Sequence, residues 1–250
     1  MEGKQVEKDQ HFLIDKKVIE KAIQEADINK EDRVLEIGCG SGNITQFLAE
    51  KAEKVLGIEI DTGFKDELEK LKKKHKNVEV VYSNLLDYDW FGYNKMISNI
   101  PFSMSEPIVQ KLSNSAVNLA VLFVGENFKN ALLSDSKIGI IARLFFYIRP
   151  VMKIDKSSFE PSPDVDSWLV KLARRKDRED YEEILVSLIR KKGKIKNAII
   201  YSLLDSGKTK NQAREFIKNS GFGEDVLNKP ISRVTGNFLL KLIEALKDAD

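Results

Sequence analysis

The sequence predicts an α/β protein with a parallel, doubly wound sheet, followed by a smaller all-helical domain. In the first two thirds of the 250 residues, short apolar runs alternate with longer stretches whose apolar residues recur at helical spacing. Beyond about residue 176 the helical period continues without interruption. We therefore expect one domain over residues 1–176 and a helical domain over residues 177–250.

Five apolar runs are expected to form the parallel strands, because they are short, rich in β-branched residues and bounded by polar or glycine-containing segments. They span residues 33–38, 54–60, 78–83, 95–98 and 119–124. Helices are expected between them over residues 43–53, 63–75 and 106–115. A loop too short for a crossover helix joins two later runs, 144–154 and 164–173, which predicts an antiparallel hairpin at one sheet edge.

The helical domain is expected to carry a basic surface. Its amphipathic segments span residues 182–190, 195–204, 210–220 and 236–248. Residues 1–170 contain 23 Lys and Arg against 27 Asp and Glu, whereas residues 171–250 contain 18 against 12. This division suggests a polyanionic partner, although charge runs are also common on solvated helices.

Composition excludes several classes of protein. No apolar run reaches the ~18 residues of a membrane span, and the N-terminal residues lack the apolar centre of a signal peptide, so a cytoplasmic location is expected. The single cysteine, Cys39, excludes an internal disulfide, and with only His11 and His75 no Cys/His zinc site can be assembled. We expect chemistry without a bound metal, and a monomer.

A glycine-rich loop follows the first predicted strand. The stretch "VLEIGCGSGNIT" places Gly38, Gly40 and Gly42 directly before a helix, where glycine permits positive φ and a close approach of the backbone to a ligand. A dinucleotide fingerprint requires glycine where this chain has Asn43. With Glu36 preceding the loop, the spacing favours S-adenosylmethionine (SAM), the alternative being a turn that merely joins strand to helix.

Polar side chains at the next two strand ends extend this candidate site. Glu59 ends the second strand, where a carboxylate can accept hydrogen bonds from ribose hydroxyls. Asn84 follows the third strand and is placed to meet the adenine edge of the same ligand. Because asparagine is also common in turns, a purely structural role for Asn84 stays open.

The stretch "NIPF" lies at the tip of the fourth predicted strand. Hydrogen bonds from an adenine amino group to Asn99 Oδ1 and the Ile100 carbonyl would make that nitrogen more nucleophilic. Pro101 would fix the turn, and Phe102 would stack on the base. No general base is required, so catalysis would rest on positioning and electrostatics. Taken alone the stretch is typical of an ordinary loop, but its place beside a SAM-type loop favours catalysis.

Together these motifs resemble the rRNA adenine N6-dimethyltransferases, which comprise the KsgA type of the small ribosomal subunit, its archaeal and eukaryotic relatives, and the Erm resistance enzymes. "EIGCGSGNIT" and "IEID" are similar to the family's first and second cofactor motifs, and "NIPFSMSEPI" is similar to its catalytic motif. "DQHFLID" (9–15) resembles the N-terminal motif that closes over SAM, and "FEPSPDVDS" (159–167) resembles a loop beside the catalytic pocket. The resemblance implies a Rossmann-like SAM-dependent methyltransferase sheet and cofactor contacts by Gln10, His11, Leu13 and Ile60.

Three positions depart from the family pattern. Phe102 replaces the usual tyrosine, which keeps the stacking ring and loses only a hydroxyl. Asn84 replaces the usual aspartate and retains a side-chain oxygen. The segment "VGENF" keeps Glu126 but lacks the family's glutamine. We expect the chemistry to be retained.

The helical domain decides which rRNA is expected. "IRKKGKIKNAI" and "KPISRVTGNFLLKL" resemble segments of the KsgA type, which implies two adjacent adenosines in a small-subunit rRNA stem-loop of the immature small ribosomal subunit. Erm-type methylation of the large subunit is the alternative within the enzyme class. An assembly factor with secondary or lost methylation is the alternative outside it. The expected RNA-binding residues are Arg190, Lys191, Lys192, Lys194, Lys196 and Arg233.

Overall fold

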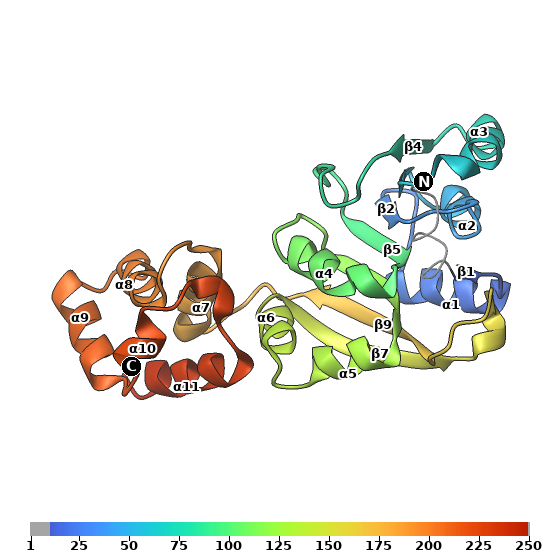
Figure 1. Ribbon diagram of the computed structural model, residues 1–250. Helices are drawn as coiled ribbons and strands as arrows, with labels where there is room; N and C mark the ends of the chain where they lie inside the picture. Colours follow the sequence, from blue (N-terminus) through green and yellow to red (C-terminus); the bar gives the residue numbers. More distant parts are fainter. Residues whose placement is uncertain (1–10, 250) are drawn as a thin grey trace, which may run out of the picture. The chain divides into compact units, whose positions relative to one another are not determined.

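The computed structural model describes residues 11–249, apart from the side chain of Phe102, and forms two compact units (Figure 1). The sheet unit contains residues 11–133 and 145–174, and the helical unit contains residues 134–144 and 175–249. The second unit begins close to the expected boundary at residue 177. It also includes a segment, 134–144, that the expected boundary assigns to the first domain.

A seven-stranded sheet with the order β4-β3-β2-β5-β6-β9-β7 organises the sheet unit. Its first five strands in this order run parallel, whereas β9 pairs antiparallel with both β6 and β7. The predicted fold class, with an antiparallel hairpin closing one edge, is thereby confirmed. The strands are β2 (Arg33–Ile37), β3 (Lys54–Glu59), β4 (Val78–Tyr82), β5 (Lys95–Asn99), β6 (Leu119–Gly125), β7 (Phe146–Ile154) and β9 (Ser167–Arg174).

Helices cover the sheet because its strands carry apolar residues on both faces. Helices α1 (Lys16–Ala26) and α2 (Thr45–Lys51) bury their apolar residues in one cluster with Val34, Val55 and Ile97 of three adjacent strands. The remaining helices of this unit are α3 (Lys65–Lys74), α4 (Ser105–Ser113) and α5 (Glu126–Leu133), with short 3-10 turns η2 (Thr62–Phe64), η3 (Phe102–Met104) and η4 (Lys156–Ser158).

Helix α1 is not among the predicted helices, yet its sequence carries a start signal. Asp15 is the N-cap, and its carboxylate accepts hydrogen bonds from the backbone N–H groups of Lys17 at 2.9 Å and Val18 at 3.4 Å. The apolar residues that follow recur at helical spacing and are buried. Helices α5 and α6 (Lys137–Phe145) are also unpredicted, and α6 delays the start of β7 to Phe146.

A second, two-stranded sheet joins the N-terminal motif to the proline-containing loop. Strand β1 (Phe12–Leu13) pairs antiparallel with β8 (Phe159–Glu160), with Phe12 opposite Glu160. Ile14 N–H also donates to the Ser158 carbonyl at 2.8 Å. Two motifs almost 150 positions apart therefore lie side by side.

The helical unit has its own core, made by the facing apolar residues of its helices. Besides α6, whose last residue belongs to the sheet unit, it contains α7 (Asp180–Arg190), α8 (Ile195–Asp205), α9 (Lys210–Asn219), α10 (Glu224–Leu227), η5 (Ile231–Arg233) and α11 (Gly236–Lys247). Capping boxes begin α7 and α9, which fixes where each helix starts. Within residues 11–249, no helix has the length and apolar character needed to cross a bilayer.

Candidate active site

The site lies at the carboxyl edge of the parallel strands, where β2 and β5 diverge. Strand β2 pairs with β3 along five residues, but with β5 only at Val34 and Leu35. Beyond these, the Ser98 hydroxyl bridges the gap, accepting from Ile37 N–H at 3.2 Å and donating to the Ile37 carbonyl. The strand order reverses at this point, and ligands of open α/β sheets bind in the crevice that such a reversal creates.

The glycine loop fills the base of this crevice. Gly38, Gly40 and Gly42 all have positive φ, at 67°, 51° and 88°. A Cβ atom added to Gly38 would lie 3.9 Å from both the Asn99 carbonyl and Pro101 Cδ, so the loop and the "NIPF" stretch adjoin one another. The structure thus brings together two motifs that are about sixty residues apart in sequence.

Glu59 holds the loop against the end of β3. Its Oε2 accepts from Gly40 N–H at 2.8 Å, and its Oε1 accepts from the N–H groups of Ile60 at 2.9 Å and Asp61 at 2.8 Å. A carboxylate offers about four acceptor positions, so these three bonds leave capacity for a ligand hydroxyl. The neighbouring Ile60 side chain is 61% exposed, which offers an apolar face at the same edge.

Glu36 is enclosed within the sheet rather than exposed in the crevice. It is 1% exposed, and Thr45 Oγ1 donates to its Oε2 at 2.6 Å. Burial raises the pKa of Glu36 to about 8, the Thr45 hydrogen bond opposes this rise, and the negative charge of Glu59 adds to it. The carboxyl group therefore joins β2 to the start of α2 and is protonated at neutral pH.

The amide of Asn99 is oriented by the N-terminal segment. Asn99 Nδ2 donates to the His11 carbonyl at 2.6 Å, and because a carbonyl can only accept, this bond leaves Asn99 Oδ1 as the free acceptor. The Ile100 side chain is buried and anchors the turn that follows. The Pro101 carbonyl accepts from Met104 N–H at 2.9 Å, which begins the η3 turn containing Phe102.

Strand β1 is fastened across the glycine loop by Asn43 and Phe12, for which the sequence predicts no role. Asn43, which stands where a dinucleotide fingerprint has glycine, donates from Nδ2 to the Leu13 carbonyl at 3.1 Å. The Phe12 ring lies over Gly40, where an added Cβ would approach it to 2.9 Å, and packs edge-on against Phe64 at 5.4 Å. The departure from a dinucleotide fingerprint is the only signal in the sequence that could have drawn attention to Asn43.

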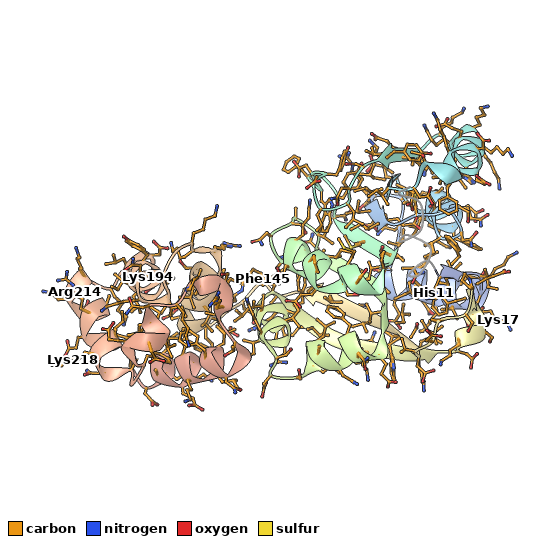
Figure 2. All side chains as sticks on the ribbon, in the orientation of Figure 1. His11, Lys17, Phe145, Lys194, Arg214 and Lys218 are labelled. Atoms are coloured by element: carbon orange, nitrogen blue, oxygen red, sulfur yellow. The ribbon has the colours of Figure 1, made fainter. Side chains whose placement is uncertain are left out.

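The proline-containing loop completes the network. His11, labelled in Figure 2, lies at the start of the described chain. Its Nδ1 lies 2.9 Å from the Pro161 carbonyl, which can only accept, so this ring nitrogen carries the proton. At the other end of the loop, Glu126 N–H donates to the Asp166 carbonyl at 2.9 Å. The N-terminal motif, the "NIPF" stretch and the loop over residues 159–167 therefore form one hydrogen-bonded assembly.

Other expected cofactor residues have different surroundings. The Leu13 side chain is 2% exposed and belongs to the core beneath α1, so it anchors the segment rather than facing the crevice. Asn84 is exposed, and its Oδ1 accepts from Leu86 N–H at 3.0 Å, which stabilises the turn after β4. Gln10 lies outside the described residues.

The expected RNA-binding residues lie on the helical unit. Lys191 pairs with Asp205, and Lys196 with Glu224 at 3.0 Å. Lys194 Nζ donates to Asn228 Oδ1 at 3.1 Å. Lys192 and Arg233 are exposed, and neither has a hydrogen-bonding or ion-pairing partner among the described residues. Arg190 is exposed at the end of α7.

The donor set of the sheet unit suits an organic cofactor. Three glycines with positive φ form a tight loop at the strand end, Glu59 can accept from hydroxyl groups, and Ile60 supplies an apolar face. Among residues 11–249 there is no cluster of three or more His, Cys, Asp or Glu side chains that could hold a metal ion.

Comparison with known proteins identifies the family. The family described as "Ribosomal RNA adenine dimethylase" matches residues 2–227. A protein of Methanococcus maripaludis named "Probable ribosomal RNA small subunit methyltransferase A" is 31% identical over 224 residues, covering 84% of this chain and 85% of its own length. A protein of the same name from Pyrococcus abyssi is 35% identical over 188 residues, covering 72% of this chain and 69% of its own length.

Solved structures agree with this assignment. A dimethyladenosine transferase from Plasmodium falciparum superposes with a TM-score of 0.67 at 26% identity, over 96% of this chain and 98% of its own. The 23S rRNA methyltransferase ErmE superposes with a TM-score of 0.65 at 25% identity, over 94% of this chain and 99% of its own. The chain therefore belongs to the ribosomal RNA adenine dimethylase family and is an rRNA adenine dimethyltransferase that uses SAM.

Proposed function

We propose that this protein dimethylates N6 of two adjacent adenosines in a small-subunit rRNA stem-loop while the small ribosomal subunit matures. The observation that carries the catalytic part of this proposal is the bond from Asn99 Nδ2 to the His11 carbonyl. It fixes the amide so that Oδ1 is directed as an acceptor, the role that binding an adenine amino group requires.

Each residue of the site has a defined part in the proposed reaction. When bound, SAM would supply an electrophilic methyl carbon and would leave as S-adenosylhomocysteine once its sulfur–methyl bond breaks. Asn99 Oδ1 and the Ile100 carbonyl accept the two N–H groups of the adenine amine, so that its lone pair becomes available and points at that carbon. Pro101 fixes the turn, and Phe102 stacks on the base. The proton released from the amine passes to water. In the second transfer only one N–H group remains on the amine, and it donates to one of the same two acceptors.

The cofactor is held by the carboxyl-edge residues. The backbone of Gly38, Gly40 and Gly42 accommodates it closely, and Glu59 accepts from its ribose hydroxyls. Ile60 and Asn84 border the adenine, whereas Gln10 and His11 close over the methionine end. Glu36 and Leu13 act indirectly, because both side chains are buried beneath the residues that face the crevice.

The small subunit is favoured as the target over the large subunit. The archaeal relatives named above carry a small-subunit name and align with most of this chain. The similarity to ErmE extends over the whole fold but does not single out the large subunit, because the dimethyladenosine transferase is equally similar. The proposal places the enzyme in the cytoplasm, acting as a monomer on the immature subunit, with the helical unit binding RNA backbone.

Transfer of labelled methyl groups tests this function. The purified protein is incubated with labelled SAM and immature small subunits, and separately with protein-free large-subunit rRNA. We expect label in the first sample, at N6,N6-dimethyladenosine. Label only in the second sample would favour the large-subunit activity. Tight binding of subunits without label in either sample would favour an assembly factor instead.

Two variants test the assignment of roles. Asn99→Ala should abolish transfer while SAM binding, measured by calorimetry, persists. Phe102→Tyr should remain active, because the proposed role needs a stacking ring and not a hydroxyl. An inactive tyrosine variant would contradict the stacking role.

A further inference from the structure

A groove on the helical unit lies between α8, α9 and α10 and is separate from the basic run at residues 190–194. It encloses about 480 Å³. We call it the α9 groove. Its lining residues are Lys196, Ile200, Arg214, Ile217, Lys218, Phe222, Glu224 and Leu227.

The rim of the α9 groove is positively charged. Arg214 and Lys218 are four residues apart on α9, so they project from the same face of the helix, where both are exposed (Figure 2). Neither has an ion-pair partner among residues 11–249. The third cation, Lys196, pairs with Glu224 at 3.0 Å across side chains that are 40% and 69% exposed. Such solvent-exposed pairs contribute little to stability, so an incoming anion can replace the glutamate.

The floor of the α9 groove is apolar and includes an aromatic ring. Ile217 and Leu227 are buried at its base. The Phe222 ring is half-buried and packs against Phe238, with centroids 4.8 Å apart and planes inclined by 34°. This contact holds the ring in place while part of it remains accessible to the groove.

We propose that the α9 groove binds an unpaired stretch of the RNA substrate, with phosphates on Arg214 and Lys218 and a base against Phe222. A rim of cations over an aromatic floor is the combination that binds single-stranded nucleic acid, since the backbone is anionic and every base offers a flat face. An acidic peptide would satisfy the cations but would leave the aromatic ring without a matching partner. The inference rests on the proposed function for the identity of the RNA.

Binding measurements on the full chain test the groove. The variant Arg214→Glu/Lys218→Glu is compared with Lys210→Glu/Lys241→Glu, which changes net charge equally at exposed lysines outside the groove. Affinity for a short unpaired oligonucleotide is measured by fluorescence anisotropy over a range of salt. The groove variant should bind roughly tenfold more weakly, and the slope of log K against log salt should fall by about 1.4, as for two lost contacts to single-stranded phosphates. The control variant should lower the affinity and the salt slope less than the groove variant does.

The variant Phe222→Leu separates stacking from charge. It keeps an apolar side chain against Phe238, so the fold should be retained, which circular dichroism checks. We expect weaker oligonucleotide binding with an unchanged salt slope. Equal effects of the two double variants, or no effect of either, would overturn the proposal. Loss of binding to an acidic peptide without loss of RNA binding would identify a protein-docking surface instead.

Methyl transfer separates failure of the groove from failure of the proposed function. With immature small subunits, the groove variant should raise KM for the subunit and leave kcat unchanged, because the catalytic residues lie in the sheet unit. If no rRNA is labelled by the unmodified enzyme, the small-subunit function fails while the oligonucleotide measurements still decide the groove. If rRNA is labelled and KM does not change, the groove alone fails.

Discussion

Glu36 shows how a single buried acid couples the site to pH. Its side chain has almost no access to water, and the hydrogen bond from the Thr45 hydroxyl satisfies only part of its bonding capacity. Because its folded-state pKa of about 8 lies above the ordinary value of 4.5, the folded protein retains a proton that the unfolded chain releases. This proton makes the stability of the protein depend on pH across that interval.

The free energy of unfolding should therefore fall as pH rises from about 4.5 to about 8 and then level off. Each pKa unit corresponds to about 1.4 kcal/mol, so the total change is a few kcal/mol. Glu36→Gln, which is neutral at every pH and can still accept from Thr45, should remove this dependence and be more stable than the unmodified protein at pH 8. Urea unfolding of both proteins at several pH values measures this pH dependence of the free energy of unfolding. Glu53→Gln, at an exposed acid, should leave the slope in place.

Gly40 is the glycine at which a side chain would do most harm. Gly40→Ala would place a Cβ 2.9 Å from the Phe12 ring, at a φ of 51°. We expect loss of SAM affinity, measured by calorimetry, because the displaced ring carries β1 away from the crevice. Gly207→Ala bears a similar backbone strain of roughly 1–2 kcal/mol at a φ of 89°, but meets no atom within 4 Å, so it should bind SAM normally. An equal loss of SAM affinity in both variants would show that backbone strain, and not the clash with Phe12, causes the loss.

At the scale of elements, strand β1 is too short to be stable alone and is held by three neighbours. It pairs with β8, its Leu13 carbonyl accepts from Asn43, and the adjacent His11 carbonyl accepts from Asn99. Any loss of these contacts should disturb the orientation of the Asn99 amide. The N-terminal segment therefore positions a residue proposed for catalysis, besides its proposed role of closing over the cofactor.

Asn43→Ala tests this positioning. Removing one hydrogen bond should cost about 1 kcal/mol of stability, whereas misplacement of Asn99 should lower kcat/KM by about tenfold to a hundredfold. Asn77→Ala is the matched control, because Asn77 Nδ2 likewise donates to backbone carbonyls, those of Ala49 and Ala52, at the opposite edge of the sheet. It should cost similar stability with little change in kcat/KM. If both variants lose activity in proportion to stability, Asn43 is merely structural.

At the scale of the whole molecule, charge is divided between the two units. The C-terminal 80 residues hold an excess of Lys and Arg, whereas the preceding residues hold an excess of Asp and Glu. Ion pairs neutralise part of the basic surface, including Lys191 with Asp205. The exposed cations without such partners should contribute most to RNA binding.

The double variant Lys192→Gln/Arg233→Gln should therefore weaken binding of immature small subunits and lower its salt dependence by up to about 0.9 per phosphate contact. Filter binding at several salt concentrations measures this. Lys51→Gln/Lys74→Gln removes the same charge from exposed positions of the sheet unit and should have a smaller effect. An unchanged salt dependence of binding in the Lys192→Gln/Arg233→Gln variant would show that the RNA-binding surface lies elsewhere.

Local pattern was sufficient to predict the seven strands of the main sheet, the edge hairpin and the four longer helices of the helical unit, but not the short strands β1 and β8. It was insufficient for α1, although Asp15 begins it, and for segment 134–144, which packs with a unit that is distant in sequence. The motif residues Asn99, Glu59 and the loop glycines lie together as expected. The roles of Asn43 and Ser98 were not predicted, because a single amide or hydroxyl has no periodicity.

The sequence by itself determined the fold class, the glycine loop and the order of the motifs, because each depends on the spacing of residues that are neighbours along the chain. Only the tertiary structure decided that β1 lies against β8, that Glu36 is buried and protonated, and that Asn99 is oriented by the His11 carbonyl. These contacts join segments separated by up to about 150 residues. Their partners are chosen by how the whole chain packs, which no local pattern encodes.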